Sequence, residues 1–169
     1  MVRLMGAVLV AAGAAWLGFG AAAGIGERVR ALSDMAGGLA VVEQELELSG
    51  APLPLLVGQA ASRSRGCARE LFSDCGSELK ELEREDFPTL WGRLVLKHRE
   101  LGEEGQRLLL SLGDVLGRCG CGEQKQRVAC VRQRLEELAA REMERQRREG
   151  RVYRALGLSG GAFLVILLL

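Results

Sequence analysis

Five cysteines are the side chains with the clearest capacity for chemistry in this chain of 169 residues. Cys119 and Cys121 form a C-x-C pair, and Cys130 follows nine residues after it. Three thiolates could begin a zinc site, but a fourth ligand and the usual C-x2-C spacing are missing. Cys67 and Cys75 stand far away in the sequence. A thiol- or zinc-dependent protein is therefore one hypothesis, and reduced, structural thiols are the other.

The single histidine, His98, stands on a charged stretch, where we expect a solvated side chain. The sequence contains no P-loop, no dinucleotide-binding glycine pattern after a strand and no G-x-S-x-G nucleophile motif. Its acidic residues alternate with arginines in a way that is typical of surface ion pairs on helices. The formal net charge of +1 gives little support to nucleic-acid binding. We therefore expect no enzymatic activity, no cofactor and no bound metal.

The elements that would hold these side chains lie between two apolar ends. At the first end, Arg3 is the only charged residue before Glu27. The 22 residues of Leu4–Ile25 would span about 33 Å as a helix, which matches a hydrocarbon core of about 30 Å. We therefore expect a transmembrane helix over residues 1–25. A cleaved signal peptide that ends at Ala21-Ala22-Ala23 is the alternative.

The opposite end is apolar as well, since no charged residue follows Arg154. Its run Leu156–Leu169 has 14 residues, or about 21 Å of helix, and local thinning of the bilayer accommodates a slightly short span. We expect a C-terminal transmembrane helix over residues 155–169. Both ends hold glycines at the small-xxx-small spacing that lets helices approach closely in lipid, although a glycine-rich composition alone would also supply them. These glycines are Gly20, Gly24, Gly157 and Gly161.

The distribution of arginine predicts which side of the membrane the middle of the chain faces. Arg28 and Arg30 follow the first apolar run, and a larger group precedes the second. That group consists of Arg141, Arg145, Arg147, Arg148, Arg151 and Arg154. By the positive-inside rule, we expect the middle of the chain to face the cytoplasm. A thiol- or zinc-dependent protein would instead have its cysteines on the outer side.

Apolar spacing predicts that residues 26–154 form a compact all-α helical bundle of about five helices, which ends in a charged stalk helix. The residues spaced for the first helix are Met35, Leu39, Val42 and Leu46. Ser49-Gly50 ends this helix, and Pro52 and Pro54 open the next, because proline is tolerated in a first turn. A third helical stretch is expected over about 61–83.

The second half of this region continues the helical pattern. Asp86-Phe87-Pro88 predicts a cap and first turn, followed by the apolar residues Leu90, Trp91, Leu94 and Val95. After a glycine-rich join at Gly102 and Gly105, the pattern continues through Leu108, Leu112, Val115 and Leu116. A last helix is expected from near Glu123. Its coiled-coil-like seam consists of Val128, Val131, Leu135 and Leu138.

Three stretches of the chain resemble the stage III sporulation protein AB family of endospore-forming bacteria. The first is Arg3–Val10 with Trp16, Gly18 and Phe19. The second is Leu39–Leu53, in which Val42-Glu43-Gln44-Glu45-Leu46 leads to Ala51-Pro52-Leu53. The third is Leu112–Gly117 with Gln124 and a Glu/Arg-rich helix that ends in Leu156-Gly157 and the aliphatic tail. In this order, the three stretches cover nearly the whole chain.

The resemblance implies a membrane component of a multiprotein channel or secretion-like complex between mother cell and forespore. Such proteins sit in the mother-cell membrane that faces the forespore, and their helical domain is similar to the cytoplasmic domain of type II secretion system F proteins. The implied partners are other stage III sporulation proteins, including a secretion-type ATPase, and a homo-oligomer is open. A general inner-membrane platform of a secretion or pilus system is the alternative with the same fold.

The resemblance also points to particular residues. Glu43, Glu45 and Gln124 match recurrent family positions, and for the two glutamates both a partner contact and a solvated face are open. Gly113 and Gly117 also match, and we expect them to allow close contact between helices. The chain departs from the family at Cys119-Gly120-Cys121-Gly122, where a polar turn is usual, so a function of these cysteines would be particular to this protein.

Overall fold

The computed structural model describes residues 26–48, 52–79 and 86–168. In the last of these ranges, side chains are described as far as Arg148. The predicted transmembrane helix over 1–25, with Gly20 and Gly24, lies outside the described residues. So do the surroundings of Gly157 and Gly161. None of the helices in the described ranges is long and apolar enough to cross a membrane. The two transmembrane helices and the domain boundaries stay predictions.

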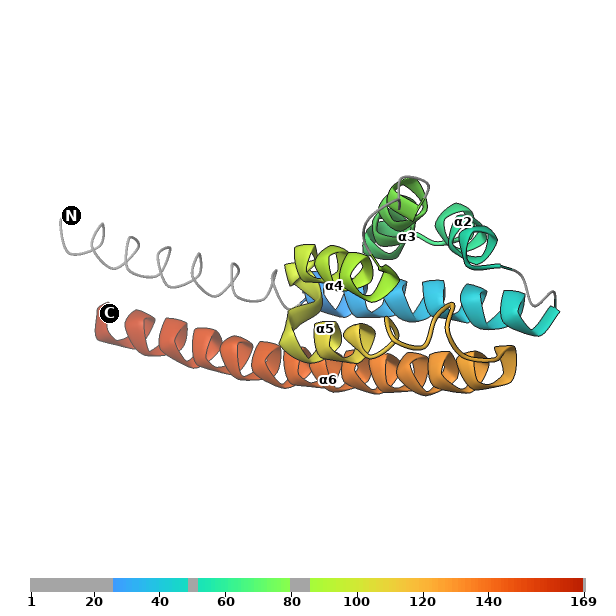
Figure 1. Cartoon of the computed structure of the whole chain (residues 1–169). Helices are drawn as coiled ribbons and strands as arrows, with labels where there is room; N and C mark the ends of the chain where they lie inside the picture. Colours follow the sequence, from blue (N-terminus) through green and yellow to red (C-terminus); the bar gives the residue numbers. More distant parts are fainter. Residues whose placement is uncertain (1–25, 49–51, 80–85, 169) are drawn as a thin grey trace. The chain divides into compact units, whose positions relative to one another are not determined.

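The described chain is all-α, as predicted. A first helix over residues 26–48 is followed by helices with the labels of Figure 1. These are α2 (Leu53–Arg63), α3 (Gly66–Glu78), α4 (Phe87–Lys97), the 3-10 turn η2 (Arg99–Leu101), α5 (Gly102–Leu110) and α6 (Cys121–Leu168). Arg28–Ala140 forms one compact unit.

Two ion pairs show that the first helix and α6 lie antiparallel. Glu43 pairs with Arg132 and Glu47 pairs with Lys125, each at 2.9 Å, so residue numbers rise on one helix as they fall on the other. Figure 1 shows the same arrangement, with the first helix in blue and the start of α6 in orange. α2 and α3 pack together as a helical hairpin, α3 contacts α4, and α4 contacts α5.

The predicted apolar positions form the core. Their members on the first helix and on α6, which include Met35, Leu39, Val128 and Leu135, are buried. One continuous cluster joins them to α2, α3, α4 and α5, with Trp91 and Phe72 as its largest side chains. Burial of one large apolar side chain contributes about 1.5–3 kcal/mol, so this cluster is the main source of stability.

The predicted start of α4 is confirmed. Asp86 has the extended backbone of an N-cap residue, and a proline occupies the first turn. The Asp86 carboxylate accepts a hydrogen bond from the Thr89 hydroxyl at 2.6 Å. Likewise, α2 begins directly after Pro52 and has a proline in its first turn.

The third helical stretch, expected over about 61–83, begins later, at Gly66, and residues 80–83 lie outside the described residues. The chain is extended at Ser64 and Arg65, so α2 and α3 are separate helices. Gly66 has a φ of +50°, and a Cβ atom there would clash with the carboxylate of Asp34 on the first helix. Glycine tolerates this conformation, and its lack of a side chain lets α3 begin against the first helix.

The helical pattern expected through Leu112, Val115 and Leu116 also ends early, because α5 stops at Leu110. Residues 111–118 form consecutive turns, with backbone bonds such as Leu112 N–H to Leu109 O at 3.0 Å. The turns still bury Leu112 and Leu116. Helical spacing is therefore kept in the burial pattern although the segment is not a regular helix.

Candidate partner-binding site

Glu43, the first predicted partner-binding residue, joins the first helix to α6. Its carboxylate accepts a hydrogen bond from Arg132 Nε at 2.9 Å, and Arg132 Nη1 also donates to Glu136 at 2.7 Å. These contacts, first that with Glu136 and then that with Glu43, raise the pKa of Arg132. The side chains of Glu43 and Arg132 are 23% and 29% exposed, so a partner could reach the pair.

Glu45 joins the first helix to a different neighbour, α2. Its carboxylate pairs with Arg63 Nη1 at 3.0 Å, and Arg63 Nη2 donates to the Gln44 side chain at 3.1 Å. Positions two apart on a helix point about 200° away from each other, so Glu43 and Glu45 lie on different sides of the first helix. The structure does not bring the two glutamates together, and exposed Gln44 lies between them in the sequence.

Gln124, the third predicted residue, lies buried in the first turn of α6. Its side-chain Nε2 donates to the carbonyl oxygen of Cys119 at 2.5 Å, and its backbone N–H donates to Gly120 O at 3.0 Å. These bonds hold the turn that precedes α6. In the described structure Gln124 is thus a positioning residue, and a partner would meet it only through that turn.

Gly113 and Gly117 occupy the turns between α5 and α6. Gly113 is buried, and a Cβ there would lie 3.2 Å from Trp91 Cδ1 and 3.4 Å from Pro88 Cα. Gly117 has a φ of +80°, and its Cβ would lie 3.2 Å from Leu53 Cδ2. The close approach is thus between a turn and the starts of α4 and α2, whereas we expected a contact between helices.

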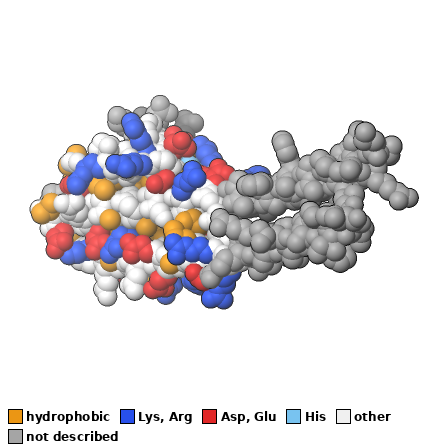
Figure 2. Space-filling model, turned by 180° about the vertical axis from the view of Figure 1, so that it is seen from behind, with side chains coloured by type: hydrophobic (Ala, Val, Ile, Leu, Met, Phe, Trp, Pro, Cys, Tyr) orange, Lys and Arg blue, Asp and Glu red, His pale blue; other side chains and the backbone are white. Residues whose placement is uncertain are grey.

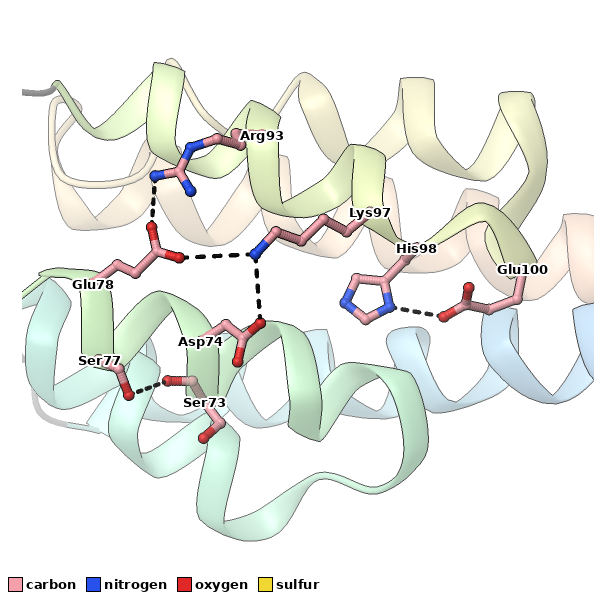
Figure 3. Close-up of polar contacts among 8 residues, drawn as sticks. All are labelled: Ser73, Asp74, Ser77, Glu78, Arg93, Lys97, His98 and Glu100. Atoms are coloured by element: carbon pink, nitrogen blue, oxygen red, sulfur yellow. Dashed lines mark hydrogen bonds and ion pairs between the residues drawn. The ribbon is translucent and has the colours of Figure 1, made fainter.

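The expectation that the side chain of His98 is solvated was wrong, because the residue is only 9% exposed. It ends α4 with a backbone that departs from helical geometry, which turns the ring inward. Its Nδ1 lies 2.7 Å from Glu100 Oε1, as Figure 3 shows, and its carbonyl oxygen accepts a bond from Gln106 at 3.1 Å. The sequence pattern assigned His98 to a helix face and missed the helix end.

Sequence reasoning also missed a polar cluster between α3 and α4. Glu78 pairs with Arg93 at 2.6 Å and with Lys97 at 3.9 Å, and Lys97 lies 4.0 Å from Asp74 (Figure 3). The available signal was the spacing, because two acids four apart and two bases four apart each occupy one helix face. The side chains are a third to a half exposed, so each pair contributes at most about 1 kcal/mol.

The cysteines fall into two groups. Cys67 and Cys75 are buried in α3, whereas Cys119 is half-buried and Cys121 and Cys130 are exposed. Burial is the main cause that raises the pKa of both α3 thiols to about 12, which opposes formation of a thiolate. Within the described residues, no three His, Cys, Asp or Glu side chains gather in a way that could hold a metal ion.

The described surface mixes charged side chains with small apolar groups. On the face drawn in Figure 2, Lys and Arg side chains are interspersed with Asp and Glu, and hydrophobic side chains lie between them in small groups. The large apolar side chains that are exposed are Leu48, Leu55, Leu96 and Met143. Apolar side chains scattered singly are usual on a protein surface and do not by themselves mark a binding site.

Comparison with known proteins shows the family of the chain and supports the fold of its helical part. Residues 3–169 match the family model of stage III sporulation protein AB. Stage III sporulation protein AB of Bacillus subtilis (strain 168) is 26% identical over 176 residues, which cover 100% of both chains. A solved structure of stage III sporulation protein AB (SpoIIIAB) shares the fold, with a TM-score of 0.62 and 21% identity over 72% of this chain and 98% of that chain. The protein described here belongs to the stage III sporulation protein AB family.

Proposed function

We propose that this protein is a non-enzymatic membrane component of the secretion-like channel complex between mother cell and forespore. In this proposal it acts as a platform that links a secretion-type ATPase to membrane partners of the same complex. Family membership implies a role in stage III of sporulation. The platform role, the partners and the location in the mother-cell membrane facing the forespore are the proposed part.

The observation that carries the proposal is the antiparallel pairing of the first helix with α6. The ion pairs Glu43–Arg132 and Glu47–Lys125 fix this direction. The chain therefore enters the compact unit at residue 28 and leaves it at residue 140 toward the same end. In the sequence, an uncharged apolar run lies beyond each of these points. A domain tethered twice to one membrane needs this arrangement.

The charge distribution supports a cytoplasmic location for the tethered domain. Arginines stand next to both apolar runs on the side of the helical domain, and only Arg3 lies on the other side of the first run. A cytoplasmic domain can meet an ATPase of the mother cell directly. The partly exposed pair Glu43–Arg132 and the exposed Gln44 offer polar contacts for such a partner on the first helix.

A crosslinking experiment in sporulating cells of the native host tests the platform role. A photoreactive amino acid at Gln44 should capture the secretion-type ATPase, whereas the same group at Glu103 on α5, which is 90% exposed, should not. Deletion of the gene should abolish heat-resistant spores. Capture of the ATPase from neither position, or normal sporulation without the gene, would contradict the proposal.

The native thiols test the orientation in the same cells. An impermeant maleimide should label exposed Cys121 and Cys130 only after permeabilisation of protoplasts, and buried Cys67 and Cys75 only after denaturation. Labelling of Cys130 in intact protoplasts would place the domain outside the cytoplasm and would exclude direct contact with a cytoplasmic ATPase.

A further inference from the structure

The turn that opens α6 holds two thiols within reach of each other. Cys119 is half-buried, Cys121 is exposed, and only Gly120 separates them. Two trans peptide bonds keep the Cα atoms of such a pair no more than about 7 Å apart. Disulfides span Cα separations of about 4.4–6.8 Å, so the spacing of the two cysteines in the chain is compatible with a bond between their sulfurs.

The surroundings of the turn leave room for this bond. A Cβ atom at Gly120 or at Gly122 would meet nothing within 4 Å, so the space beside both residues is open. In contrast, the ends of the turn are held. Gln124 binds the carbonyl oxygen of Cys119 at 2.5 Å, and Lys125 ties the next residues to Glu47 at 2.9 Å. A closed ring would therefore act on the turn and on the bonds from Gln124 to Cys119 O and Gly120 O at the start of α6.

The two pairs of cysteines that share a helix lie too far apart to form a bond. Cys67 and Cys75 are eight residues apart in α3, which is a rise of about 12 Å, and both are buried. Cys130 follows Cys121 by nine residues in α6, which is a rise of about 13.5 Å to the opposite face. Neither of these two pairs within a helix can therefore close a bond, whereas Cys119 and Cys121 are separated by a single residue.

We propose that Cys119 and Cys121 form a reversible redox pair that exchanges with low-molecular-weight disulfides. The exposed thiolate of Cys121 attacks one sulfur of a small disulfide, which gives a mixed disulfide and releases one small thiolate. The thiolate of Cys119 then attacks Cys121 Sγ, which closes the Cys119–Cys121 bond and releases the second thiolate. Two electrons pass from the protein to the small disulfide, and the two protons of the protein thiols end on the two small thiols.

The strain of so small a ring makes the disulfide of this pair easy to reduce. A disulfide that closes over a single intervening residue is constrained, and strained or exposed disulfides are the ones that thiols reduce readily. The pair therefore stays a dithiol in a reducing cytoplasm and closes when small disulfides accumulate. It makes the start of α6 sensitive to thiol redox state, which is a property separate from the platform role.

Glutathione disulfide is the probe that tests this pair in the full-length protein, held in detergent micelles. The variant Cys130→Ser should lose about 2 Da on oxidation, with the bond mapped by peptide mass to Cys119 and Cys121. Wild type should show the same bond together with a glutathione adduct on exposed Cys130. Dithiothreitol should restore the mass. In Cys119→Ser the second step is impossible, so a glutathione adduct should persist on Cys121 at about tenfold or more the level in wild type.

Each possible result decides the question. Equal and persistent glutathione adducts on Cys121 and Cys130 of wild type, with no closed ring, would show two independent thiols and overturn the proposal. A bond between two chains in place of the internal one would overturn it as well. Retention of the closed ring in Cys130→Ser, together with its loss in Cys119→Ser, would establish the pair.

Discussion

The pocket of Trp91 and the seam between the first helix and α6 hold the domain together in different ways. Trp91 is 1% exposed, and its ring centroid lies 5.9 Å from that of Phe87 and 6.1 Å from that of Phe72. Its Nε1 donates a hydrogen bond to Leu109 O at 2.7 Å. The surface of the seam consists instead of partly exposed ion pairs, of which Glu43–Arg132 is the most enclosed.

The difference separates residues that hold the fold from residues that are free to take part in function. A buried indole contributes through apolar area, ring contacts and a satisfied hydrogen bond. A partly exposed ion pair contributes little, because water and salt screen it. Glu43 and Glu45, the positions that resemble the family pattern, belong to the second kind. Their substitution can therefore report on partners without unfolding the domain.

The largest expected effect is the loss of Trp91. Trp91→Ala should lower the free energy of unfolding by about 3–5 kcal/mol, because it opens a cavity between α3, α4 and the turns after α5. Trp91→Phe should lower it less, by about 1–2 kcal/mol, because a ring remains but the bond to Leu109 O is lost. Denaturant unfolding followed by circular dichroism measures both values. A loss below about 1 kcal/mol for Trp91→Ala would show that the pocket does not dominate stability.

A second effect concerns the two buried thiols and appears only at high pH. Burial raises the pKa of Cys67 and Cys75 from 9.0 in an unfolded chain to about 12. Above about pH 9 the unfolded state loses these protons and the folded state keeps them, so stability that is complete below pH 9 is lost as the pH rises toward 12.

Unfolding midpoints at about pH 8 and about pH 10 measure this loss, which should be on the order of 1 kcal/mol for each thiol. The double variant Cys67→Ala/Cys75→Ala is the control, because it removes the titrating groups and leaves the other bases and the tyrosine in place. An equal pH dependence in wild type and in this variant would contradict the assignment to the thiols.

Helix types and core faces could be predicted from the sequence, because apolar spacing and proline are local signals. Met35, Leu39, Val128 and Leu135 were placed in the core correctly. The break at Ser64–Arg65 and the inward turn of His98 were not predictable in this way. Both depend on contacts across the fold, such as Asp34 against Gly66, which no local pattern records.

The candidate site was less predictable than the fold. The residues Glu43, Glu45 and Gln124 were selected by resemblance, yet their neighbours Arg132, Arg63 and Cys119 come from distant parts of the chain. A carboxylate in a sequence gives no sign of whether an arginine 89 positions away will meet it. Only the structure shows that these polar groups already bind within the chain.

Gly113 and Gly120 allow the same substitution to be compared in a packed turn and in an open turn. Gly113→Ala should cost about 1–3 kcal/mol, because its Cβ would lie 3.2 Å from Trp91 Cδ1 and the indole has no free space to yield. Gly120→Ala should change stability by no more than about 0.5 kcal/mol, because nothing lies within 4 Å of its Cβ. Equal losses in the same unfolding assay would show that the turns after α5 do not pack against the Trp91 pocket.

The smallest effect on stability is expected at Glu43, where an effect on function would be most informative. A double-mutant cycle of Glu43→Gln and Arg132→Gln should give a coupling of about 0.5–1 kcal/mol at low salt, and less at high salt. The matched control is Glu47→Gln, which breaks the ion pair with Lys125 between the same two helices. Because the Glu43 pair is the more enclosed of the two, the free energies of unfolding of both variants are measured as well. A lower yield of heat-resistant spores with Glu43→Gln alone, without a larger loss of stability, would assign a partner contact to Glu43. Equal yields with both substitutions would limit Glu43 to holding α6.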